Sequence, residues 1–149
     1  MKRNRLKSNF SSYVSLILGL FIWGPSLALF AGTSETPKVA IPKTIPAIWK
    51  AIDAHGASIN QAIKDNKLTS IHDHAFAIRD LTHALPPLSE RLSEEQRQTV
   101  QDTLGFVNQL ATRLDKTGDA NDKEGTVANW TKLQKLLSQL RAFYKDDVR

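Results

Sequence analysis

The sequence predicts an all-α protein, an antiparallel up-down-up-down four-helix bundle that follows a signal peptide. Three observations lead to this prediction. Apolar residues recur at three- and four-residue steps in four separate segments. None of these segments alternates apolar and polar residues as a half-buried strand would. The connections between the segments are short and polar or contain proline, which places consecutive helices side by side in opposite directions.

The composition is that of one globular domain. The chain has 149 residues, of which 41% are hydrophobic and 23% charged. It contains no cysteine, which excludes disulfides, cysteine zinc sites and thiolate catalysis. A helical domain of this size can bury a core without disulfides.

Residues 1–28 have the three parts of a secretory signal peptide. An apolar run over residues 13–23 ends at Gly24-Pro25, and Ser26-Leu27-Ala28 forms a small-x-small cleavage site. Cleavage is expected after Ala28, with Ala31 as the second choice. The run is about half of the ~20 residues needed to cross a bilayer, so no stable membrane anchor is expected after cleavage. The predicted location is the periplasm. The basic residues that precede the run are Lys2, Arg3, Arg5 and Lys7.

The net charge of the whole chain is misleading. It is +5, from 20 basic and 15 acidic residues. The signal peptide contains four of the basic residues and no acidic one, which leaves 16 against 15, a net charge of +1. Basic and acidic residues are interleaved along the remainder, as on a solvated surface. Nucleic-acid binding is therefore not expected.

The bundle is predicted over residues 46–145, after an extended, proline-containing leader over residues 29–45. The first helix is expected over residues 46–64, with an apolar stripe that includes Ile52 and Ile59 and on which His55 also falls. Residues 65–67 form a short polar turn.

The second helix is expected over residues 68–85. Thr69 or Ser70 can cap it, and Ser70 and Asp73 have the spacing of a capping box. Pro86-Pro87 ends it, because proline lacks the amide donor that a helix needs. Its inward stripe consists of Ile71, His74 or Ala75, Ile78, Leu81 and Leu85.

The third and fourth helices are expected over residues 94–116 and 122–144. Ser93 and Gln96 form a capping box, and Thr117-Gly118 is expected to stop the third helix with Gly118 in the left-handed conformation. The fourth helix has a seven-residue apolar repeat typical of a bundle seam. The residues of this repeat are Val127, Trp130, Leu133, Leu137, Leu140 and Tyr144.

The chain resembles the periplasmic cytochrome b562 group. The similarity is best in the LDKTGD segment at residues 114–119 and in the LRAFYK segment that closes the fourth helix at residues 140–145. In that group, a Met near the start of helix 1 and a His near the end of helix 4 hold the haem. This chain has neither, since its one Met is Met1 and no His follows His83. The resemblance thus implies the architecture, and haem held through non-standard ligands is the weakest of the functional alternatives.

Histidines are the candidate functional residues. With no Cys, and no Met after Met1, the four histidines are the only nitrogen or sulfur metal ligands expected in the mature chain. His55 and His74 fall on the inward stripes of adjacent antiparallel helices, so a shared ion or a mutual hydrogen bond is sterically possible. His72 is a candidate third ligand, although it points about 200° away from His74 in a regular helix. Cu(II), Ni(II) or Zn(II) would suit such ligands. The alternative is that these histidines have only local partners.

No catalytic constellation, phosphate loop or HExxH motif is present in the sequence. The sequence therefore predicts an exported, non-enzymatic binding protein that holds a transition-metal ion through His55 and His74, with His72 as the possible third ligand. The main alternative is a structural or partner-binding bundle without a small ligand.

Overall fold

The structure is a computed structural model that describes residues 39–147. It contains four α-helices, α1 (Ile45–Lys64), α2 (Ile71–His83), α3 (Glu94–Asp119) and α4 (Lys123–Ala142). Two short 3₁₀ turns, η1 (Leu68–Ser70) and η2 (Pro86–Leu88), flank α2. The predicted all-α class is confirmed, and the described part of the chain contains no strand. The predicted signal peptide and its cleavage site lie outside the described residues.

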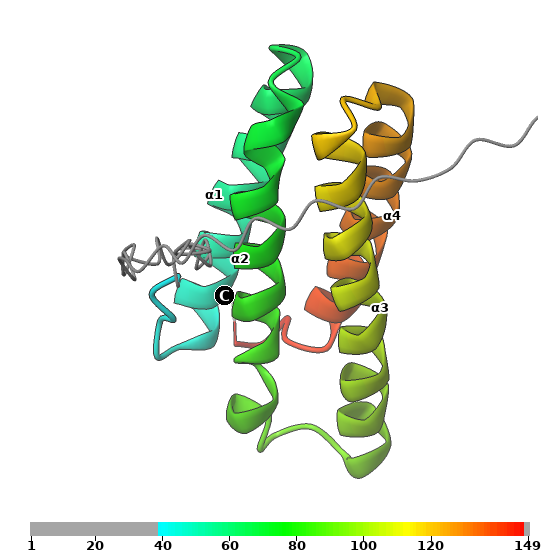
Figure 1. The fold of residues 1–149 in the computed structure, drawn as a ribbon. Coiled ribbons are helices and arrows are strands. Elements are labelled where there is room, and N and C mark those ends of the chain that lie inside the picture. The colour runs from blue at the N-terminus through cyan, green and yellow to red at the C-terminus, as the bar shows by residue number, and fades with distance from the viewer. Residues whose placement is uncertain (1–38, 148–149) are drawn as a thin grey trace, which may run out of the picture. The chain divides into compact units, whose positions relative to one another are not determined.

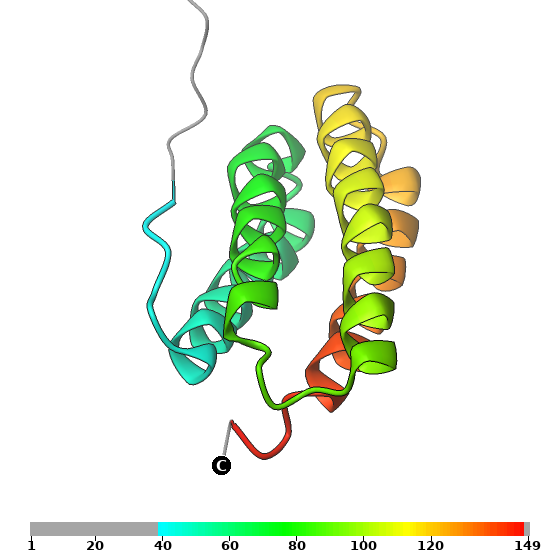
Figure 2. The same ribbon diagram turned by 90° about the horizontal axis from the view of Figure 1, so that it is seen from below.

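Each helix packs along the next one in sequence, and α1 also touches α4. The α1–α2 and α3–α4 turns lie at one end of the helices, and the connection that contains η2 lies at the other end (Figure 1). Seen from below, the α1–α2 pair stands beside the α3–α4 pair (Figure 2). Within residues 39–147, no helix combines the length and the apolar character that a bilayer-spanning helix needs.

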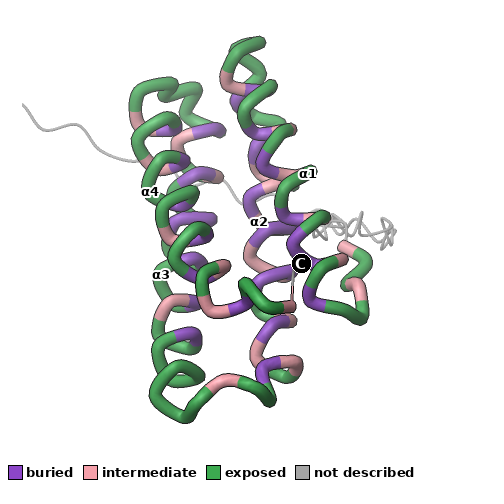
Figure 3. The backbone as a smooth tube through the Cα atoms, turned by 180° about the vertical axis from the view of Figure 1, so that it is seen from behind, coloured by how far each residue is buried: buried purple, intermediate pink, exposed green. Residues whose placement is uncertain are grey.

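The buried residues line the inner faces of all four helices (Figure 3). Most of the predicted stripes are confirmed, and Tyr144 belongs to this core although it follows the end of α4. The prediction is wrong for one residue of the seam. The side chain of Val127 is 41% exposed, and Thr126 is buried in its place. Thr126 can be buried because its hydroxyl donates a hydrogen bond to the Asp122 carbonyl.

The predicted cap of α2 is also wrong. Ser70 has helical backbone angles, with φ −75° and ψ −7°, rather than the extended conformation of an N-cap. Its hydroxyl donates to the Lys67 carbonyl in the preceding turn. The helix thus begins through the 3₁₀ turn η1 and starts at Ile71, later than expected.

The end of α3 differs from the prediction at Gly118. The helix continues through Gly118 to Asp119, and Asn121 takes the left-handed conformation with φ 52°. Gly118 is buried where α3 meets η1, and a Cβ there would lie 2.6 Å from the Leu68 carbonyl oxygen. This glycine therefore permits a close approach between two elements and does not terminate the helix.

The start of α3 and the end of the fold are fixed by side-chain hydrogen bonds. Ser93 and Gln96 form the predicted capping box, with both reciprocal bonds present. Beyond α4, the buried Tyr144 hydroxyl lies 2.7 Å from Ser89 Oγ. Ser89 Oγ donates its one proton to the Leu85 carbonyl, so the Tyr144 hydroxyl donates to Ser89. This chain of bonds fastens the C-terminal turn to the connection between α2 and α3.

Candidate functional sites

His55 on α1 and His74 on α2 face each other between the two helices. Their Nδ1 atoms are 3.0 Å apart and the ring centroids 5.3 Å apart, with the ring planes tilted by 49°. The sequence predicts either a shared ion or a mutual hydrogen bond between these two histidines, and the hydrogen bond is confirmed. Both side chains are half-buried. Binding of an ion by this pair stays a prediction.

The surroundings of His55 favour its neutral imidazole. Burial lowers the pKa of His55 below the ordinary value of 6.5, and the neighbouring His74 lowers this pKa further. In the neutral pair, one ring donates its Nδ1 proton and the other accepts it through a lone pair. A neutral imidazole is the form that ligates metals, so the lowered pKa keeps His55 in the state that coordination requires.

His72 does not join this pair. Its Nδ1 atom is 2.6 Å from Asp115 Oδ1 on α3, and its ring packs edge-on against Phe76. Across residues 39–147, no three His, Asp or Glu side chains come together as a metal site. The structure thus brings together two of the three candidate ligands and uses the third to link α2 with α3.

His83 is exposed at the C-terminal end of α2. Its neighbours Arg79 and Asp80 pair with each other, with Arg79 Nη2 2.7 Å from Asp80 Oδ1. His83 is therefore a suitable control position for experiments on the other histidines.

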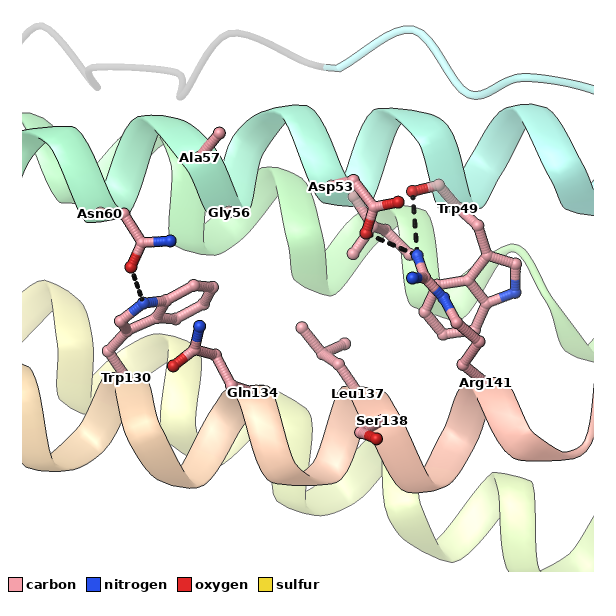
Figure 4. Close-up of a pocket in the computed structure, with 11 residues that line it drawn as sticks. Trp49, Asp53, Gly56, Ala57, Asn60, Trp130, Gln134, Leu137, Ser138 and Arg141 are labelled. Atoms are coloured by element: carbon pink, nitrogen blue, oxygen red, sulfur yellow. Dashed lines mark hydrogen bonds and ion pairs between the residues drawn. The ribbon is translucent and has the colours of Figure 1, made fainter.

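A groove of about 360 Å³ lies between α1 and α4 (Figure 4). Its floor includes Gly56 and Leu137, and its rims are polar. At one end, Trp130 Nε1 donates to Asn60 Oδ1 across the two helices at 2.7 Å. The Gly56 position is tight, since a Cβ there would lie 3.3 Å from the Trp130 ring.

The other end of the groove is closed by Arg141. Its Nη2 atom donates to Asp53 Oδ1 at 2.5 Å and to the Trp49 carbonyl at 3.4 Å. Its guanidinium carbon also lies 4.6 Å from the centroid of the Trp49 ring. Both tryptophans are buried.

This groove is not among the sites that the sequence predicts. A signal was present in the spacing of polar and aromatic residues along one face of each helix. On α1, Trp49, Asp53 and Asn60 are separated by four and seven residues; on α4, Trp130, Gln134 and Arg141 are separated in the same way. Such spacing is also typical of ordinary surface pairs, so it indicates a groove only when the two helices are known to be neighbours.

A third feature is an apolar patch on the outer side of α3 and α4. Phe106 is 56% exposed, and a depression of about 320 Å³ lies beside it, with Leu110 and Leu136 in its lining. Arg113 and Lys132 stand at its edge. We call these five residues the Phe106 patch.

Comparisons of the chain with models of protein families, with curated proteins and with solved structures find no match. The similarity to the cytochrome b562 group therefore stays a prediction made from two short segments and an all-α architecture.

Proposed function

We propose that this chain is an exported, non-enzymatic binding protein that holds a divalent transition-metal ion between His55 and His74. The observation that carries the proposal is the 3.0 Å separation of the two Nδ1 atoms. Two half-buried imidazoles on adjacent helices, of which that of His55 has a lowered pKa, form an open two-ligand site. Water or a small anion would complete the coordination shell.

The separation of the two nitrogens suits two ligands of one ion. With metal–nitrogen bonds of about 2.0–2.1 Å, neighbouring ligands lie about 2.9 Å apart in a square plane and about 3.3 Å apart in a tetrahedron. The observed 3.0 Å falls between these values, so the helices need not move far. Each ring must tilt by about 35–45° to direct its lone pair at the ion, since the two Nδ1 atoms now face each other.

Binding at this site does not require the pair to lose a proton. The ring that donates its Nδ1 proton in the free protein can shift to the tautomer protonated at Nε2. Both Nδ1 atoms then present lone pairs to the ion. The lowered pKa of His55 supports this step, because few imidazolium ions compete with the metal at neutral pH.

The proposed setting is the periplasm, reached through the signal peptide expected at residues 1–28. The basic start, short apolar run and small-residue cleavage site support this setting. We also propose the up-down-up-down antiparallel topology. It is supported by the turns, which lie alternately at opposite ends of the helices (Figure 1).

A second candidate function is binding of a protein partner through the Phe106 patch. An exposed aromatic residue beside an apolar depression, flanked by Arg113 and Lys132, is typical of an interaction surface. Haem has the least support, because all four histidines lie in residues 55–83, on α1 and α2. No histidine on α3 or α4 can ligate from across the core.

Calorimetric titration of the full chain with CuCl₂ and ZnCl₂ tests the metal proposal. His55→Ala and His74→Ala each remove one ligand and should weaken binding at least about tenfold. His83→Ala alters an exposed histidine outside the pair and should leave the affinity unchanged. Absence of binding, or equal affinity in both ligand variants and the original chain, would overturn the proposal.

A further inference from the structure

The groove between α1 and α4 keeps hydrogen-bonding groups that the fold does not use. Arg141 Nη1, the Asn60 amide nitrogen and the Ser138 hydroxyl make no hydrogen bond to any group in residues 39–147. The same is true of the Gln134 amide. These groups come from both helices and line the rims of the groove in Figure 4.

The groove carries no net charge. Its two charged side chains, Asp53 and Arg141, form an ion pair with each other. An anionic ligand would meet the Asp53 carboxylate, which is 61% exposed, and a cationic ligand would meet the guanidinium. The electrostatics therefore favour an uncharged ligand.

The shape of the floor excludes ligands that bind mainly by stacking. Trp49 and Trp130 are 1% and 5% exposed, so neither indole offers an open face to a flat aromatic ring. Arg141 already covers the ring of Trp49. The apolar part of the floor is a strip that includes Gly56, Ala57 and Leu137, of which Ala57 is exposed. A purely apolar ligand would fit this strip but would separate the polar rims from water.

We infer that the α1–α4 groove is a binding site for a neutral saccharide. A sugar ring has C–H faces that can lie on the apolar strip and hydroxyl groups at its edges that both donate and accept. Asp53 can accept from such hydroxyls, the Asn60 and Arg141 nitrogens can donate, and Gln134 and Ser138 can do both. The volume of about 360 Å³ is at the small end of ligand pockets, which suits one or two sugar rings. This site shares no residue with the proposed metal pair.

Two-dimensional ¹H–¹⁵N NMR of the full chain tests this inference. The probes are maltose, cellobiose and N,N′-diacetylchitobiose, with nicotinamide as a neutral, flat aromatic comparison. The indole N–H of Trp130 should shift saturably with at least one disaccharide, because its partner Asn60 is at the rim. Nicotinamide should leave it unchanged.

Two variants of α1 provide a matched test. Ala57→Leu places a larger side chain at the groove, whereas Ala54→Leu makes the same change at an exposed position that does not line it. The first should weaken disaccharide binding at least about tenfold and the second should leave it unchanged. Gln134→Leu keeps the size of a rim residue but removes its amide, and should weaken binding about tenfold.

Three results would overturn the inference. The first is no saturable shift with any of the disaccharides up to about 10 mM, a range that covers millimolar affinities. The second is equal disaccharide binding by the two alanine variants. The third is binding of nicotinamide without binding of a sugar, which would indicate a site for aromatic amides.

Discussion

Replacement of Gly118 by alanine should destabilise the protein, although alanine is the better helix former. Gly118 lies in the last turn of α3, where the helix meets η1. A Cβ at this position would lie 2.6 Å from the Leu68 carbonyl oxygen and 3.9 Å from Ile71 Cβ. The obstacle is main chain, so no side-chain rotation relieves it. Either α3 or η1 must move, and Leu68 and Ile71 are both buried in the core.

The expected magnitude follows from two opposing contributions. Forcing extra volume into a packed core costs about 1–3 kcal/mol, and the upper part of this range applies where the backbone must move. Alanine in place of glycine within a helix contributes about 1 kcal/mol in the other direction. The net effect at Gly118 is therefore a loss of about 1–2 kcal/mol in the free energy of unfolding.

Gly105 provides the control for this prediction. It is exposed in the middle of the same helix, and a Cβ there would meet nothing within 4 Å. Gly105→Ala should therefore stabilise the protein by about 0.5–1 kcal/mol. Urea unfolding followed by far-UV circular dichroism gives both values from the midpoint and slope. Equal stabilisation by the two substitutions would refute the close approach of α3 and η1.

Three further predictions concern other hydrogen bonds and the histidine pair. Tyr144→Phe removes the buried bond to Ser89 and should lower the free energy of unfolding in urea by about 1 kcal/mol; an unchanged midpoint would contradict that bond. Ser93→Ala removes the side-chain acceptor of the Gln96 backbone N–H and should lower the free energy of unfolding by about 1 kcal/mol in the same assay. An unchanged free energy of unfolding would mean that the capping box contributes little. The pKa of His55 in the folded protein lies below the ordinary 6.5 of the unfolded chain, so the unfolded state binds a proton more readily as the pH falls. The contribution of His55 to the free energy of unfolding is therefore complete above pH 6.5 and is lost as the pH drops through the folded-state pKa. Urea midpoints at about pH 7.5 and pH 5 should show a smaller loss in His55→Gln than in the original chain, and an equal loss would show that His55 does not contribute.

Helix content and the main core positions could be predicted from the sequence because they depend on local periodicity. The 3.6-residue period decides which face of each helix is apolar, and Ser93 with Gln96 marks the start of α3. The wrong predictions concern positions whose environment is set by contacts between elements distant in the sequence. Gly118 resembles a helix stop in sequence, but its role depends on η1, which lies 48 residues or more away in the chain. Val127 continues the heptad, yet Thr126 is the residue that faces the core.

The candidate sites also differ in whether local sequence or distant contacts set their geometry. The contact of His55 with His74 could be predicted, because a short turn fixes the register of two adjacent helices. The partner of His72 could not, since Asp115 is on another helix and 43 residues away. The groove between α1 and α4 depends on the spacing between the first and last helices, and no short connection fixes that spacing. Its polar rims are therefore visible only in the folded chain.

The most direct test of the proposed function is a count of the imidazoles bound to Cu(II). Pulsed electron paramagnetic resonance of the chain loaded with one equivalent of Cu(II) detects the nitrogens of equatorial imidazole ligands. The proposed two-histidine site predicts two such imidazoles in the original chain and in His83→Ala, and one in either His55→Ala or His74→Ala. The same number of imidazoles in the original chain and in both ligand variants would contradict it.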